Sequence, residues 1–156
     1  MANQSQGLNE DRVACLIGGF IFLLGMAYFW GVDLIGWICK MGMWVGDPMK
    51  CFKAAHKGYM EGWQALICTY VFVTVMLAVG IKLMKGNVFR FIIAFTVVYF
   101  IAICCYVIGA NAYIAANPTQ IAKMGVPWAL GLSTEAGLIV ALIVGIIIGN
   151  LFPGVV

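Results

Sequence analysis

Four apolar runs, each about as long as a membrane is thick, constrain this chain more than any other feature. No Asp, Glu, Lys or Arg occurs within residues 13–32, 62–81, 91–122 or 136–156. A helix crosses about 30 Å of hydrocarbon with roughly 20 residues, because each residue adds about 1.5 Å. The runs lack the alternation of barrel strands, and lipid offers no partner for a free backbone group. Each run is therefore expected to contain a transmembrane helix.

The expected spans are residues 13–32, 63–81, 91–110 and 136–152. In the third run, Asn117 and Pro118 interrupt the apolar sequence, so we expect a loop over residues 111–135. Pro153 ends the last helix. The sequence thus predicts an all-α integral membrane protein with four transmembrane helices. A polar N-terminal tail, 1–12, precedes a single membrane domain, 13–156.

The composition supports a membrane protein and argues against a nucleic-acid partner. Of the 156 residues, 64% are hydrophobic and 10% are charged, whereas soluble domains average roughly 45–50% and about 25%. The net charge of +3 is scattered along the chain and forms no basic face for phosphates. The expected partners are membrane lipids, other membrane helices and an inorganic anion.

Positive charges give a weak orientation signal. With four spans, one side carries four Lys or Arg residues and the other carries five. The short connector between the second and third spans holds Lys82 and Lys85 and no acid, and short loops follow the positive-inside rule best. The first run follows Glu10 and Asp11 rather than a basic region, so it is expected to be retained and not cleaved as a signal peptide. We expect a multi-pass protein of the bacterial cytoplasmic (inner) membrane with both termini cytoplasmic.

Residues 33–62 are too polar to span and too apolar to be an ordinary loop. Trp37 and Trp44 flank Lys40, an arrangement suited to the headgroup boundary. Two alternatives are open: an interfacial segment packed on the helices, or a re-entrant loop lining a pathway.

Within this segment an amphipathic interfacial helix is expected from Asp47 and Pro48 onward, with Asp47 as its N-cap. Apolar and aromatic residues recur at helical spacing, and charged residues fall on another face. The first set is Met49, Phe52, His56, Tyr59 and Trp63; the second is Lys50, Lys53, Lys57 and Glu61. Lys50, Lys53 and Lys57 then either collect an anionic solute or snorkel toward phospholipid headgroups.

The sequence shows no pattern typical of a catalytic, cofactor or metal site. None of the six cysteines is in C-x-x-C spacing, and His56 is the single histidine. The acids flank the expected spans and none lies deep in one. We expect no cofactor, no metal and no enzyme activity.

The last expected helix carries a stripe of small residues, one every four positions. Such a stripe lets another backbone approach closely, as in G-x-x-x-G packing. Asn111 and Asn117 are expected to cap turns in the loop, and Asn150 to bridge helices or meet interfacial solvent. The stripe consists of Gly137, Ala141, Gly145 and Gly149.

Residues 135–153, EAGLIVALIVGIIIGNLFP, resemble the first core helix of the YeiH-like sulfate exporter family. The shared pattern is A-G, a stretch of small apolar residues, G-x-x-x-G-N and a nearby proline. Residues 8–13, 31–37 and 112–116 are similar to the N-terminal membrane extension of longer relatives.

This resemblance implies a polytopic inner-membrane protein of anion export, with a core of inverted repeats. The sequence would supply the N-terminal extension and the first core helix only. The expected function is therefore a membrane module of an anion (sulfate-like) transporter that is not transport-competent alone. The alternative is a structural or accessory subunit of a larger membrane complex.

Overall fold

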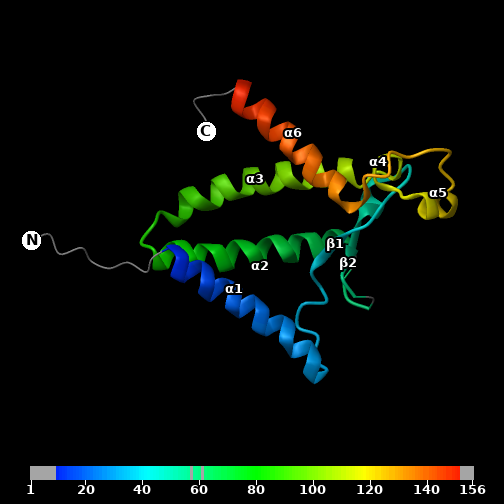
Figure 1. The fold of residues 1–156 in the computed structure, drawn as a ribbon. Helices are drawn as coiled ribbons and strands as arrows, with labels where there is room; N and C mark the ends of the chain where they lie inside the picture. Colours follow the sequence, from blue (N-terminus) through cyan, green and yellow to red (C-terminus); the bar gives the residue numbers. More distant parts are fainter. Residues whose placement is uncertain (1–9, 57, 61, 152–156) are drawn as a thin grey trace, which may run out of the picture.

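A computed structural model describes residues 10–56, 58–60 and 62–151 (Figure 1). Four helices make up most of it, and shorter elements gather at one end. The long helices are α1 (Glu10–Met26), extended by the 3-10 turn η1 (Ala27–Trp30), α2 (Gly62–Leu83), α3 (Val88–Gly109) and α6 (Ala136–Leu151). The shorter elements are β1 (Cys39–Met41), η2 (Pro48–Cys51), β2 (Phe52–Ala54), α4 (Ala112–Ala115), α5 (Pro118–Met124) and η3 (Ser133–Glu135).

Three of the helical segments are long and apolar enough to cross a membrane. They are Glu10–Trp30, Gly62–Leu83 and Val88–Gly109, which match the first three expected spans within a few residues. Helix α6 has 16 residues and reaches about 24 Å, short of a hydrocarbon core of about 30 Å. The fourth span is therefore not confirmed.

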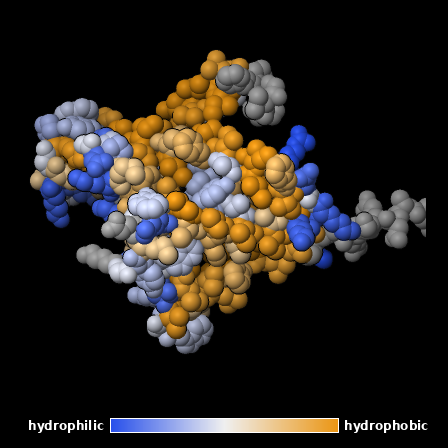
Figure 2. All heavy atoms as spheres, turned by 180° about the vertical axis from the view of Figure 1, so that it is seen from behind, coloured by the Kyte–Doolittle hydropathy of each residue, from blue (hydrophilic) through white to orange (hydrophobic). Residues whose placement is uncertain are grey.

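The surface agrees with a membrane location. In Figure 2 apolar residues cover the middle of the helices, and hydrophilic residues gather at the two ends. Within the apolar window of each of the three long segments, only 6% of the residues are buried. The helices thus turn apolar side chains outward, toward lipid or toward other membrane helices.

Glycines mark the places where these helices approach most closely. A Cβ on Gly80 of α2 would lie 2.9 Å from Ile17 Cδ1 of α1. A Cβ on Gly109 of α3 would lie 2.5 Å from Gly137 Cα of α6. In each of these two helix pairs, a glycine therefore allows the neighbouring helix to approach the backbone closely.

The described residues are mostly helical, as expected, but the expected interfacial amphipathic helix is wrong. Asp47 does cap a turn that begins at Pro48, with Asp47 Oδ1 accepting from Met49 N at 3.1 Å. That turn, η2, ends at Cys51, and β2 then pairs antiparallel with β1. Gly58 has φ of +100°, a conformation that a helix does not contain. The strand pairing and a hydrogen bond from Cys39 N to Thr69 Oγ1 of α2 satisfy backbone groups of the hairpin.

The expected loop over residues 111–135 contains α4 and α5 and has a small core of its own. Ala112, Ala116 and Val126 are buried there, with Met43 from the hairpin loop packed against them. Asn111 Oδ1 accepts from Tyr113 N at 3.0 Å and so caps α4. The expected capping role of Asn111 is confirmed.

Candidate functional site

The β1–β2 hairpin is fixed to the start of α2 by one polar side chain and one glycine. Cys39 N donates to Thr69 Oγ1 at 2.8 Å, and that hydroxyl donates to Ala65 O at 2.7 Å. A Cβ on Gly62 would collide with the carbonyl oxygen of Phe52 in β2. Hairpin and helix are therefore in backbone contact, which holds the exposed side of the hairpin at the N-terminal end of α2.

Three lysines line an open cleft on that exposed side. Lys40 of β1 and Lys53 of β2 are direct partners in the strand register, and Lys50 lies in η2. The cleft has a volume of about 810 Å³, and His56 and Trp63 also line it. Like charges directly opposite each other destabilise a strand pair. The register therefore places two cationic side chains opposite each other on the exposed face of the hairpin.

One ion pair is found among residues 10–56, 58–60 and 62–151, and it borders this cleft. His56 Nδ1 lies 2.5 Å from Asp33 Oδ2, and the His56 ring stacks on Tyr28 with centroids 5.6 Å apart. Tyr59 Oη donates to Asp33 O at 2.9 Å. This cluster ties the end of the first helical segment to the chain that leaves the hairpin.

The charge of Asp33 is stabilised in this cluster. Burial raises the pKa of Asp33, but the His56 hydrogen bond, the backbone N–H of Gly36 and the His56 charge together bring it below its ordinary value of 3.8. Asp33 therefore remains ionised down to acidic pH. Its negative charge is taken up by His56 rather than by the lysines of the cleft.

The two hairpin cysteines are poor nucleophiles. Burial raises the pKa of the Cys39 thiol, and burial likewise raises that of Cys51. Both thiols are therefore protonated at neutral pH, and the thiol form is unreactive. Within the described residues, no three His, Cys, Asp or Glu side chains gather to hold a metal ion.

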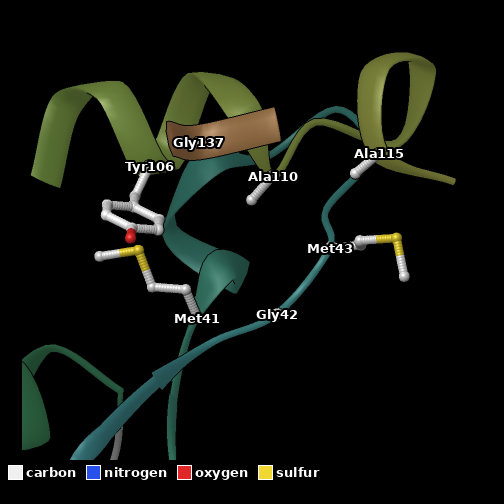
Figure 3. A pocket seen from close by; sticks show the side chains of 7 residues that line it. All are labelled: Met41, Gly42, Met43, Tyr106, Ala110, Ala115 and Gly137. Atoms are coloured by element: carbon white, nitrogen blue, oxygen red, sulfur yellow. The ribbon is translucent and has the colours of Figure 1, made fainter. Parts of the chain in front are cut away.

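A second cavity, of about 310 Å³, lies between the hairpin, α3, α4 and α6 (Figure 3). Tyr106 and Met41 point toward each other on one side of it, and Met43 lies on the other. The lining contains no charged side chain. It is a mostly apolar gap at a helix junction, with the Tyr106 side chain as the polar group among its lining side chains.

Some of the predicted site residues lie in the cleft or in a helix contact, and others do not. Lys50 and Lys53 line the cleft, whereas Lys57 lies outside the described residues. In the stripe, Gly137 is buried and Ala141 is half-buried. A Cβ on Gly145 or on Gly149 would meet no atom within 4 Å.

The predicted packing stripe is therefore used at one end only, with the rest of it open. The Nδ2 of Asn150 donates to Ile146 O of its own helix at 2.7 Å, and no bridge from Asn150 to another helix is found within the described residues.

Sequence reasoning missed Lys40, Gly109 and Thr69. A signal for Lys40 was available, since Cys39-Lys40-Met41 and Phe52-Lys53-Ala54 both alternate apolar and polar residues as strands do. Gly109 and Thr69 carried no signal, because one glycine or one threonine in an apolar run has no distinctive spacing.

Comparison with known proteins places this chain beside a larger membrane protein. It is 28% identical over 146 residues to a UPF0324 membrane protein of Nitrosomonas europaea, an alignment that covers 92% of this chain. The chain spans about 30% of the length of that relative. No family profile matches the chain, and no solved structure is similar to it. The similarity supports a relation to the UPF0324 (YeiH-like) membrane proteins.

Proposed function

We propose that this chain is a membrane module of an anion (sulfate-like) transporter and does not form a complete pathway alone. The similarity, which covers nearly all of this chain but about 30% of a larger membrane protein, supports a module of a larger protein. The anion assignment rests on the resemblance of residues 135–153 to the YeiH-like sulfate exporter family. Its role is packing and assembly rather than chemistry, and we assign it no catalytic step. We place it in the bacterial cytoplasmic membrane with both termini cytoplasmic.

The exposed part of α6 supports an assembly role. Leu142, Ile146 and Leu151 are 65%, 56% and 67% exposed, on the helix that also carries the open Gly145 and Gly149. Small residues permit close backbone approach between membrane helices. A further membrane helix can therefore pack against α6, and α6 would then form the fourth transmembrane crossing within a larger bundle.

The experiment measures efflux of labelled sulfate from preloaded cells that lack this chain. Efflux should slow on its removal and recover with the wild-type chain, but not with Gly145→Leu, which fills the open end of the stripe. Gly18→Leu on α1 is the matched control, since a Cβ on Gly18 also meets no atom within 4 Å. Unchanged efflux without the chain would refute the transporter role. Sulfate flux from the purified chain alone in proteoliposomes would refute its being an incomplete module.

The second candidate is a structural or accessory subunit of a different membrane complex. The same open face of α6 favours it. Gly145→Leu would then abolish co-purification of the partner while sulfate efflux stays normal. The two candidates are therefore separated by a single variant read in two assays.

A further inference from the structure

The lysine cleft does not stand alone, because an apolar groove continues from it along α2. The groove has a volume of about 520 Å³. Met60 lines both the cleft and the groove. The cleft and the groove are therefore adjoining parts of one surface, which is cationic at the N-terminal end of α2 and apolar farther along this helix.

One line of residues on α2 joins the two parts. Trp63 lines the cleft, and Ile67, Val71 and Val75 follow at intervals of four residues along the groove. All four side chains are between 51% and 55% exposed. Residues four apart are neighbours on a helix surface, so the line leads away from the lysines along α2 while winding gradually around it.

The length of this line matches one membrane leaflet. Trp63 and Val75 are twelve residues apart on α2, which corresponds to about 18 Å at about 1.5 Å per residue. Half of a hydrocarbon core of about 30 Å is about 15 Å. An acyl chain with its headgroup at the cleft would therefore lie along the groove for most of its length.

We propose that this surface is a specific binding site for an anionic phospholipid. Lys40, Lys50 and Lys53 receive the phosphate headgroup, which relieves the repulsion between Lys40 and Lys53 in the strand register. Trp63 lies at the level where headgroup and hydrocarbon meet, a position that suits an indole ring. Ile67, Val71 and Val75 contact one acyl chain.

The same lysines would also attract a free oxyanion such as sulfate or phosphate, because the charge and hydrogen-bonding chemistry is shared. The adjoining apolar groove favours a lipid, because an acyl chain can occupy it and a small inorganic ion cannot make apolar contacts there. This assignment does not depend on the transporter role, and its test involves no transport.

The test uses the complete chain in mixed micelles with equimolar phosphatidylglycerol and phosphatidylcholine of identical acyl chains, with retained lipid counted by native mass spectrometry. The wild-type chain should prefer phosphatidylglycerol. The variant K40Q/K50Q/K53Q should lose at least about tenfold of that preference, as expected for three lysines near an anionic headgroup. K82Q/K85Q, which removes two exposed lysines at the other end of α2, one in its last turn and one just beyond it, should keep it.

A second pair of variants tests the groove. Val71→Trp fills it and should weaken retention of phosphatidylglycerol severalfold. Val97→Trp on α3 lines neither the cleft nor the groove and is similarly exposed, so it should have no effect. Far-ultraviolet circular dichroism of each variant establishes that it is folded, and Lys53→Gln alone replaces the triple variant if that one is not.

Two outcomes would overturn the assignment. If the folded lysine variant retains its preference, the cleft does not bind the headgroup. If glycerol phosphate or inorganic phosphate displaces phosphatidylglycerol at equal concentration and Val71→Trp binds lipid normally, the cleft is a site for a free oxyanion. Loss of preference in both Val71→Trp and the lysine variant, with both controls intact, supports the lipid site.

Discussion

Replacing Gly109 with alanine should force α3 and α6 apart, and it is the smallest change that tests how they pack. A Cβ at this position would lie 2.5 Å from Gly137 Cα and 2.7 Å from the carbonyl carbon of Ala136. Both are backbone atoms, so no side-chain rotation relieves the overlap. Ordinary van der Waals contact begins at 3.4 Å, and Gly137 N would lie nearer still than Gly137 Cα, so the helices must separate by at least about 0.9 Å, the difference between 3.4 and 2.5 Å.

That separation sets the expected loss of stability. Overpacking a well-packed contact costs about 1–3 kcal/mol, and a gap of about 0.5–1 Å forfeits a quarter to a half of the dispersion energy across it. The neighbouring Ala110 carbonyl accepts a hydrogen bond from Trp44 N at 3.2 Å, so a shift here also disturbs the hairpin loop. We expect Gly109→Ala to lower the free energy of unfolding by about 2–3 kcal/mol, at the upper end of that range.

Two further glycines calibrate the effect. A Cβ on Gly137 would lie 2.6 Å from the Tyr106 ring, which can turn, so Gly137→Ala should cost about 1–2 kcal/mol. A Cβ on Gly145 meets nothing within 4 Å. Alanine favours a helix over glycine by up to about 1 kcal/mol, so Gly145→Ala should leave stability unchanged or slightly raised.

Denaturant unfolding in a single detergent, followed by circular dichroism, ranks the three variants. The expected order of stability is Gly145→Ala, then Gly137→Ala, then Gly109→Ala. Wild-type stability for Gly109→Ala would refute the contact between α3 and α6. A loss at Gly145→Ala as large as at Gly109→Ala would refute the inference that this part of α6 is free in the isolated chain.

Three other changes test the hairpin, the ion pair and the loop. Thr69→Val keeps the side-chain shape but leaves Cys39 N without its acceptor, so it should cost about 1–3 kcal/mol in the same unfolding assay; a loss no larger than that of Val97→Ala would contradict the docking role. The pKa of Asp33 is lowered in the folded chain, so its ionised form stabilises the fold above about pH 3.8 and this contribution disappears as the pH falls through the lower, folded value. Asp33→Asn should therefore flatten the decline in stability below that pH, measured by acid titration of the circular dichroism signal, and an unchanged profile would exclude Asp33 as its source. Asn111→Ala removes the cap of α4 and should cost about 0.5–2 kcal/mol; an equal effect of Asn111→Ser, which can still cap, would show that capping is not the cause.

The long helices could be predicted because their signal is local. In lipid, an uninterrupted apolar run forms a helix, because a helix pairs the backbone N–H and C=O groups of the run with one another. The expected spans 63–81 and 91–110 therefore located α2 and α3 within three residues of their observed bounds. The fourth run gave a helix as well, but whether 16 residues cross a membrane depends on neighbours that sequence periodicity does not encode.

The hairpin could not be predicted because two patterns overlap in the same residues. Met49, Phe52 and His56 fit a helical repeat, while Phe52-Lys53-Ala54 fits strand alternation. The choice is made by contacts distant in sequence: the pairing with residues 39–41 and the Thr69 hydroxyl. Neither appears in a local window, and the candidate cleft exists only once they have formed.

The small-residue stripe of α6 is predicted to pack against another helix, and only one end of it does so within the described part of this chain. Small residues at every fourth position predict that α6 packs closely against something, and Gly137 does so against α3. Helix α6 then diverges from α3 (Figure 1), which leaves Gly145 and Gly149 open. A single stripe on one helix can thus serve two contacts, the first within this chain and the second with a helix outside it. Gly145→Ala and Gly145→Leu separate them, since alanine should leave the isolated chain stable whereas leucine should block assembly without unfolding it.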